Sequence, residues 1–216
     1  MSRAWIFVPA SGDTTVDKLV GNLQSKGWGG DDAEVVTPGD DVLTEVNDEQ
    51  DPVLYIAGHG NFGQGIGTHK THYGARRLVQ LLIQAGLEKT QKNLTIHLVS
   101  CNSGVSCRRK YVFAHRDPYV KRFAEALAAQ QFTGITVVAY IGFVTSQLTS
   151  ALIYNLRKNV KELEIKVNLK GAGGASRMVT YEVEEETGAS KISGPDYESR
   201  IGVGRKTFGR IRIVRK

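Results

Sequence analysis

Strand-length apolar runs alternate with amphipathic segments of helical period along the first two thirds of the chain. Strands are predicted at residues 4–8, 34–36, 53–57, 94–100 and 135–141, of which the last three are apolar enough to be buried. Helices are predicted at residues 15–26, 73–85 and 117–130, with one further turn of helix near residues 42–46. The order β-α-β-β-α-β-α-β is typical of an α/β fold with a mostly parallel sheet and helices on both faces.

Two connecting segments are predicted to be loops. Residues 61–72 are rich in glycine and contain His69 and His72, and residues 102–116 are polar and basic. The spacing of the two histidines suits a metal ion, but no obvious third ligand motif accompanies them. We therefore expect no metal site here, and a mobile loop that carries two exposed histidines.

The hydrophobic pattern changes near residue 145. A helix is predicted at residues 146–158, and alternation of apolar and polar residues between glycine-rich turns then predicts antiparallel hairpins. The corresponding strands are predicted at residues 162–168, 177–184, 191–193 and 208–214. We divide the chain into an α/β core at residues 1–145 and an extension at residues 146–216, which packs on the same domain.

The composition is that of an ordinary soluble globular protein, with 41% hydrophobic and 23% charged residues among 216. No apolar stretch approaches the roughly 20 residues of a membrane span, and the amino terminus lacks the pattern of a signal peptide. Cys101 and Cys107 are the only cysteines, which is not a disulfide framework, although a disulfide closing a small loop stays open. We expect two free thiols in a reducing, cytosolic compartment.

Basic residues are concentrated at the end of the chain. Residues 187–216 contain eight lysines and arginines and two acidic residues. The net charge of this segment therefore equals the formal net charge of the whole chain, +6. This excess predicts a polyanionic partner, or equally a solvated hairpin face. Nucleic acid is disfavoured, because Tyr197 and Phe208 are the only aromatic residues in this segment and no stacking motif is present.

The most informative residues follow two of the predicted buried strands. His59 follows the strand at 53–57, and Cys101 follows the strand at 94–100. The carboxyl ends of parallel strands lie at one edge of a sheet, so we expect the imidazole and the thiol to lie together. An imidazole that removes the thiol proton makes cysteine a nucleophile. The backbone N–H groups of Gly60 and Cys101 are predicted to form an oxyanion hole.

Taken singly, a histidine at a strand end and a buried cysteine are more often structural than catalytic. Their joint occurrence, each followed by a nearby glycine, favours a cysteine endopeptidase that uses a His59/Cys101 dyad. The histidine precedes the cysteine, which is the reverse of the order in α/β-hydrolases. Asp13, just after the first strand, is the candidate for a third catalytic acid or for a helix N-cap, with Asp48 and Asp51 as less favoured candidates.

An apolar strand with Gly58-His59-Gly60, then a helix, then an apolar strand with Ser-Cys-x-x-Gly resembles the caspase-like cysteine peptidases. That group includes caspases, legumain, gingipain, clostripain, separase and the self-processing domains of large bacterial toxins. The Gly-His-Gly form is most similar to the domains of the MARTX and clostridial glucosylating toxins. The resemblance covers residues 4–145 and implies a caspase-like fold, with His59 as catalytic base or acid and Cys101 as nucleophile.

The similarity to the toxin domains also implies an activator. Those domains bind inositol hexakisphosphate in a basic pocket beside a carboxyl-terminal β-flap, and the basic segment here lies at the corresponding position. The candidate polyanion-binding residues are Arg200, Arg205, Lys206, Arg210 and Arg212. The chemistry itself requires no cofactor. The resemblance further implies cleavage after leucine, with an apolar pocket near Ile141 and Phe143, and action in the cytosol of a target cell.

Two other functions are consistent with the sequence. The first is a non-enzymatic α/β module that binds a polyanion through its basic carboxyl-terminal segment. The second is a thiol-dependent acyl transferase or amidase on the same scaffold. Thiol reactivity at Cys101 distinguishes the first from a peptidase, and substrate profiling distinguishes the second.

Overall fold

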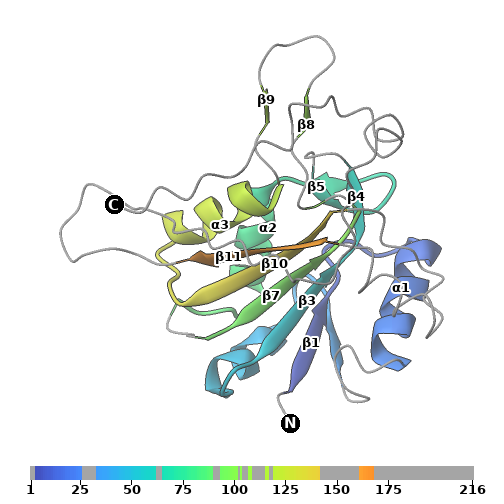
Figure 1. Ribbon diagram of the computed structural model, residues 1–216. Coiled ribbons are helices and arrows are strands. Elements are labelled where there is room, and N and C mark those ends of the chain that lie inside the picture. The colour runs from blue at the N-terminus through green and yellow to red at the C-terminus, as the bar shows by residue number, and fades with distance from the viewer. Residues whose placement is uncertain are drawn as a thin grey trace.

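A mostly parallel sheet forms the centre of the molecule. The computed structural model describes residues 3–25, 33–61, 65–89, 93–101, 103, 107–108, 115–116, 119–141 and 161–167. Within these residues, six strands pair in the order β11-β10-β7-β3-β1-β2 (Figure 1). They are β1 (Ala4–Phe7), β2 (Glu34–Val36), β3 (Val53–Ala57), β7 (Thr95–Val99), β10 (Ile135–Ile141) and β11 (Lys161–Val167). The first five are parallel, and β11 runs antiparallel to β10.

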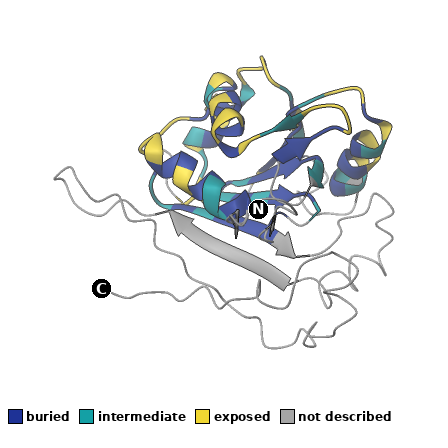
Figure 2. Cartoon of the chain, turned by 90° about the horizontal axis from the view of Figure 1, so that it is seen from above, coloured by how far each residue is buried: buried dark blue, intermediate teal, exposed yellow. Residues whose placement is uncertain are grey.

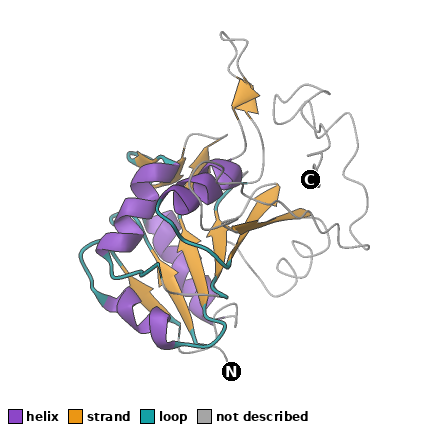
Figure 3. Ribbon diagram, turned by 90° about the vertical axis from the view of Figure 1, so that its left-hand side faces the viewer, coloured by secondary structure: helices purple, strands orange, loops and turns teal. Residues whose placement is uncertain are grey.

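Helices cover both faces of this sheet (Figure 3). They are α1 (Thr14–Ser25), α2 (Ala75–Gln84) and α3 (Tyr119–Ala129), and a 3-10 helix, η1, spans Val42–Asp48. Side chains alternate along each strand: in β1, Trp5 and Phe7 pack with α2 and α3, whereas Ala4 and Ile6 pack with α1. Strands β1, β3 and β7 are therefore buried on both sides, and the buried residues are dark blue in Figure 2. None of the described helices is long and apolar enough to cross a membrane.

The α/β fold class and the element order of the core are confirmed. Strands β3 and β10 have the predicted bounds, and α1 and α2 begin and end within two residues of prediction. Gly86 adopts a left-handed φ of 99° after the end of α2, and its N–H donates to the carbonyl of Ile83 in the last turn. Strand β11 lies beyond the predicted boundary at residue 145 and pairs with β10, so it belongs to the main sheet. The helix predicted at 146–158 and the later hairpins lie outside the described residues.

The prediction of a loop at residues 61–72 is wrong. An antiparallel sheet forms there from β4 (His59–Asn61), β5 (Gly65–Gly67) and β6 (His72–Tyr73). Glycine is required at two positions where neighbouring backbones approach closely. A Cβ on Gly65 would lie 2.5 Å from the carbonyl oxygen of Tyr73, and a Cβ on Gly67 would overlap the carbonyl oxygen of Thr71. The glycines thus allow tight strand packing instead of flexibility, and His72 is half-buried, whereas His69 is exposed as predicted.

The predicted loop at residues 102–116 also contains strands. Cys107–Arg108 (β8) and His115–Arg116 (β9) pair as a short antiparallel ladder. Two residues per strand are too few for the alternation of apolar and polar residues that identifies a strand in a sequence. The prediction of an uninterrupted loop therefore fails there for lack of a signal.

The strand order reverses direction at one place in the sheet. The chain passes from β1 outward to β2, then crosses to the other side of β1 to form β3, and continues outward through β7 and β10. The switch point therefore lies between β1 and β3. In open α/β sheets, ligands bind at the carboxyl ends of the strands beside such a point. The residues that follow β1, β3 and β7 consequently define the place to look for a site.

Candidate active site

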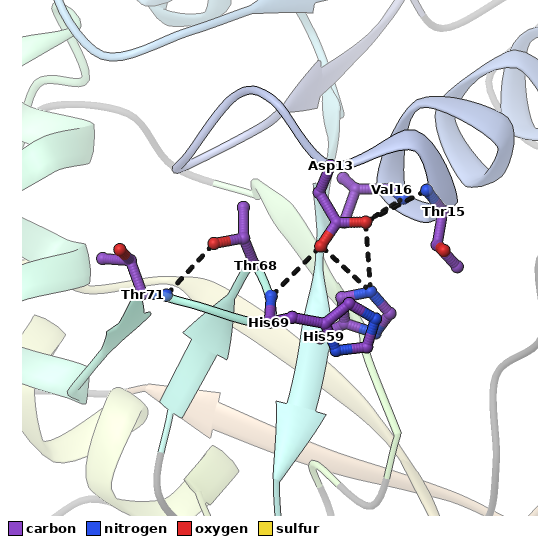
Figure 4. Close-up of polar contacts among 7 residues, drawn as sticks. All are labelled: Asp13, Thr15, Val16, His59, Thr68, His69 and Thr71. Carbon is purple, nitrogen blue, oxygen red and sulfur yellow. Dashed lines mark hydrogen bonds and ion pairs between the residues drawn. The ribbon is translucent and has the colours of Figure 1, made fainter.

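Asp13 follows β1 and begins α1. Its Oδ1 accepts hydrogen bonds from the backbone N–H groups of Thr15 at 3.0 Å and Val16 at 3.4 Å, so the predicted N-cap role is confirmed (Figure 4). The side chain is only 7% exposed, which keeps water from competing for the carboxylate. Asp13 therefore sits in a fixed orientation at one side of the switch point.

His59 follows β3 on the other side of the switch point. Its Nε2 lies 3.3 Å from Oδ2 and 3.4 Å from Oδ1 of Asp13, and its side chain is 22% exposed. A carboxylate accepts hydrogen bonds, so this contact places the proton of the neutral ring on Nε2 and leaves Nδ1 as the basic nitrogen. The same aspartate thus caps a helix and orients a histidine 46 positions away.

The turn between β5 and β6 closes over this pair. It is held by hydrogen bonds from the backbone N–H of Thr68 to the carbonyl of Thr71, at 2.8 Å, and from the N–H of Thr71 to Oγ1 of Thr68, at 3.1 Å. This turn aims the backbone N–H of His69 at Oδ2 of Asp13, 3.1 Å away. The His69 ring stacks on the His59 ring, with centroids 3.7 Å apart and planes 28° from parallel (Figure 4).

The hydrogen bonds to Asp13 determine its charge state. Burial by itself raises the pKa of Asp13. The backbone N–H groups of His69, Thr15 and Val16, together with positive charge on His59, outweigh burial and lower that pKa from 3.8 to about 2. Asp13 is therefore a carboxylate throughout the neutral range, and it can both hold a neutral imidazole and stabilise a protonated one.

Cys101 lies two residues beyond β7, in a turn that is tied to its surroundings. Oγ of Ser103 donates to the carbonyl of Leu98 at 3.1 Å, and the carbonyl of Ser103 accepts the N–H of Val120, in the first turn of α3, at 3.1 Å. Ser100 is 1% exposed, whereas Cys101 is half-buried. The turn therefore presents the cysteine at the carboxyl edge of the sheet.

The ends of β3 and β7 touch through their backbones. The N–H of Gly58 donates to the carbonyl of Val99 at 3.3 Å, which extends the pairing of the two strands up to the residue before His59. A Cβ on Gly60 would overlap the carbonyl oxygen of Cys101 and lie 2.9 Å from its nitrogen. The two residues predicted to form the oxyanion hole, Gly60 and Cys101, are therefore in direct backbone contact.

The fold brings Asp13, His59, Gly60 and Cys101 to one edge. Asp48 and Asp51 precede β3 and lie toward its opposite, amino-terminal end. The five candidate polyanion-binding residues lie outside the described residues, as does Phe143, and the side chains of Cys107 and Ile141 are not described.

Sequence reasoning missed His69 as a neighbour of His59. The signal was the apolar Ile66 between Gly65 and Gly67, which is buried in β5 and marks a strand. The structure groups His69 with residues other than His72, the histidine with which the sequence pairs it. Among the described residues, one donor atom from each of Asp13, His59 and His69 lies within 4.8 Å of the others.

A family model described as "Domain of unknown function (DUF8616)" matches residues 32–150, which is more than half of the chain. This chain therefore belongs to that family. The matched residues include His59, His69 and Cys101, whereas Asp13, β1 and α1 precede them. No curated protein matches the chain.

Proposed function

We propose that the chain is a cysteine endopeptidase of caspase-like fold, with Cys101 as nucleophile, His59 as general base and acid, and Asp13 as the residue that positions His59. One observation carries the proposal. After the adjacent strands β1 and β3, the ionised carboxylate of Asp13 faces the imidazole of His59. Gly60, the residue after His59, lies against the backbone of Cys101, which follows β7. Acid, imidazole and thiol at one sheet edge are the groups that thiol-dependent acyl transfer requires.

The proposed reaction uses Nδ1, the ring nitrogen of His59 that does not face Asp13. Nδ1 takes the proton from the Cys101 thiol, and the thiolate attacks the scissile carbonyl carbon to form a tetrahedral intermediate. The N–H groups of Gly60 and Cys101 donate to its oxyanion. His59 then returns the proton to the departing amine, which leaves a thioester. Water, deprotonated by His59, hydrolyses the thioester to the carboxylic acid and restores the thiol.

Asp13 acts through His59 in this scheme. Its carboxylate accepts the Nε2 proton, which keeps the ring in the tautomer with a basic Nδ1. It also stabilises the imidazolium that forms when the thiol is deprotonated. The three backbone N–H groups around Asp13 prevent it from taking that proton itself, because they keep its pKa near 2.

Regulation by inositol hexakisphosphate extends the proposal. Arg200, Arg205, Lys206, Arg210 and Arg212 supply the converging positive charge that a polyphosphate requires, as the resemblance to self-processing toxin domains implies. Under this proposal the ligand raises the reactivity of Cys101, and the domain cleaves its own polypeptide.

The test is labelling of the protein by an irreversible, thiol-directed peptide probe that ends in leucine. We expect labelling of the wild type and of Cys107→Ala, which removes the other thiol, and none of Cys101→Ala or His59→Ala. Added inositol hexakisphosphate is expected to accelerate labelling. Equal labelling with or without it would retain the enzyme and remove the activator. If no labelling depends on both His59 and Cys101, the peptidase proposal fails and polyanion binding becomes the leading function.

A further inference from the structure

His69 has no part in the proposed peptidase chemistry, yet it lies at the centre of the site. One imidazole and one carboxylate suffice to activate a thiol. Here a second imidazole stacks on the first at 3.7 Å between centroids, and its backbone N–H is bonded to the same carboxylate. The turn that carries it is held by two hydrogen bonds of its own. The structure thus places two imidazoles and one carboxylate together, which is a ligand set.

The separation of the donor atoms suits a small divalent ion. Two atoms bound to one Zn²⁺ at about 2.0–2.1 Å in a tetrahedron lie about 3.4 Å apart. Nε2 of His59 and Oδ2 of Asp13 are 3.3 Å apart. One donor atom from each of Asp13, His59 and His69 lies within 4.8 Å of the others. His69 is exposed on its turn, so its side chain can rotate away from the His59 ring. Three protein ligands would leave a fourth tetrahedral position open.

The surroundings of Asp13 match those of a ligating carboxylate. Metal-bound carboxylates are themselves hydrogen-bonded, which fixes the direction of their lone pairs. Asp13 accepts the N–H groups of Thr15, Val16 and His69 while it faces the two rings. Two imidazoles with one carboxylate favour first-row transition ions over Mg²⁺ or Ca²⁺, which prefer oxygen ligands.

We propose that Asp13, His59 and His69 bind one divalent transition-metal ion of the Zn²⁺ type, and that the bound ion keeps the peptidase inactive. The inhibitory role rests on the proposed function, whereas metal binding does not. The ion takes the carboxylate and the imidazole from the catalytic arrangement. When Nε2 binds the metal it carries no proton, so the proton of the neutral ring lies on Nδ1, which then cannot accept the proton of Cys101. Removal of the ion restores the Asp13–His59 contact seen in the structure.

Metal binding is tested on the full chain by calorimetric titration with Zn²⁺ and by the absorption spectrum with Co²⁺. We expect one ion per wild-type chain. His69→Ala retains the backbone N–H to Asp13 and should bind about 10-fold or more weakly. Lys70→Ala changes the charge of the same turn without removing a ligand and should bind like the wild type. Absence of binding to the wild type, or equally tight binding to His69→Ala, would overturn the metal site.

Zn²⁺ also binds cysteine thiolates, so the position of the ion must be checked separately. We expect Cys101→Ala to bind the ion as tightly as the wild type. Loss of binding in Cys101→Ala with full binding in His69→Ala would place the ion between Cys101 and His59 and overturn the proposed ligand set.

The inhibitory role is tested by labelling of Cys101 with the peptide probe, with each variant compared with its own metal-free rate. Zn²⁺ should slow labelling of the wild type and of Lys70→Ala, and a chelator should restore it. About 10-fold more Zn²⁺ should be needed for His69→Ala. If metal binds through His69 but labelling is unaffected, the inhibitory role is wrong. If no variant is labelled without metal, the peptidase proposal fails while the binding result stands.

Discussion

The carboxyl ends of β3 and β7 present the two reactive residues in different ways. At β3, side-chain charge orients His59: its Nε2 faces an ionised Asp13, and His69 stacks on the ring. At β7, uncharged contacts position Cys101: Ser103 ties the adjoining turn to Leu98 and to α3, and Gly60 lies against the cysteine backbone.

The two strand ends therefore fix different properties. The β3 end fixes the direction in which an imidazole points, and the β7 end fixes the position of a thiol. A ring must point a particular nitrogen at its partner, which requires a charged or polar group at its other nitrogen. A thiol needs only to be brought to the right place, which a rigid turn achieves. Changes at the β3 end should therefore affect rate more than stability, and changes at the β7 end should affect both.

The largest effect is expected from Asp13→Asn. The amide still accepts a helix-capping N–H but carries no charge for His59. We expect the limiting rate of Cys101 labelling to fall about 10²- to 10⁴-fold. The concentration of probe for half-maximal rate should change little, because Asp13 positions His59 and does not bind substrate.

Asp17→Asn is the matched control for this change. It removes a carboxylate from the exposed side of the first turn of the same helix and should leave the labelling rate unchanged. A labelling rate for Asp13→Asn within a few-fold of the wild type would show that Asp13 only caps α1, and the contrast between the two strand ends would disappear.

The next largest effect is expected from acid, which should lower the stability of the fold through β7, the strand that precedes Cys101. Burial lowers the pKa of His97, in β7, from 6.5 to about 4. Below pH 6.5 the unfolded chain takes up a proton that the folded chain resists, so stability is full above pH 6.5 and falls until pH 4. The loss is up to about 3 kcal/mol.

Chemical unfolding of the wild type at several pH values measures this loss. His97→Phe keeps an aromatic ring beside Tyr55, on which His97 stacks at 4.9 Å, but it cannot titrate. Its stability should depend less on pH between 6.5 and 4. If the two curves are parallel, another group is responsible for the acid sensitivity of β7.

A smaller loss of stability is expected from Gly60→Ala, because Gly60 lies where the two strand ends meet. The added methyl would overlap the carbonyl of Cys101, so one of the two backbones must shift. We expect the free energy of unfolding to fall by about 1–3 kcal/mol, and labelling of Cys101 to fall with it. Equal labelling of this variant and the wild type would show that the contact between Gly60 and Cys101 does not position the thiol.

The smallest effect, of opposite sign, is expected from Gly21→Ala. Gly21 lies in the exposed middle of α1, where an added Cβ meets nothing within 4 Å. Alanine should raise the free energy of unfolding by about 0.5–1 kcal/mol, because it restricts the unfolded chain. Labelling should not change, which makes this variant a control for Gly60→Ala. Lower stability would indicate a contact of α1 that this packing does not show.

Much of the fold was predictable because its signals are local. The strand at 53–57 is a continuous apolar run, and α2 shows helical spacing of leucines with a glycine cap at Gly86. The β4–β6 sheet was not predictable in this way. Glycines at 65 and 67 are typical of a flexible loop, and only their contacts with Tyr73 and Thr71 show that each marks a place where two backbones meet.

By itself the sequence determined the α/β class, the strand ends that carry His59 and Cys101, and the position of Asp13 after β1. Hydrophobic period and capping residues act within a few positions of the chain, so they can be recognised without its partners. Only the tertiary structure decided that Asp13 faces His59, that His69 stacks on the same ring, and that Gly60 meets Cys101. Those contacts join segments up to 46 positions apart, and strand order and the docking of one turn create them.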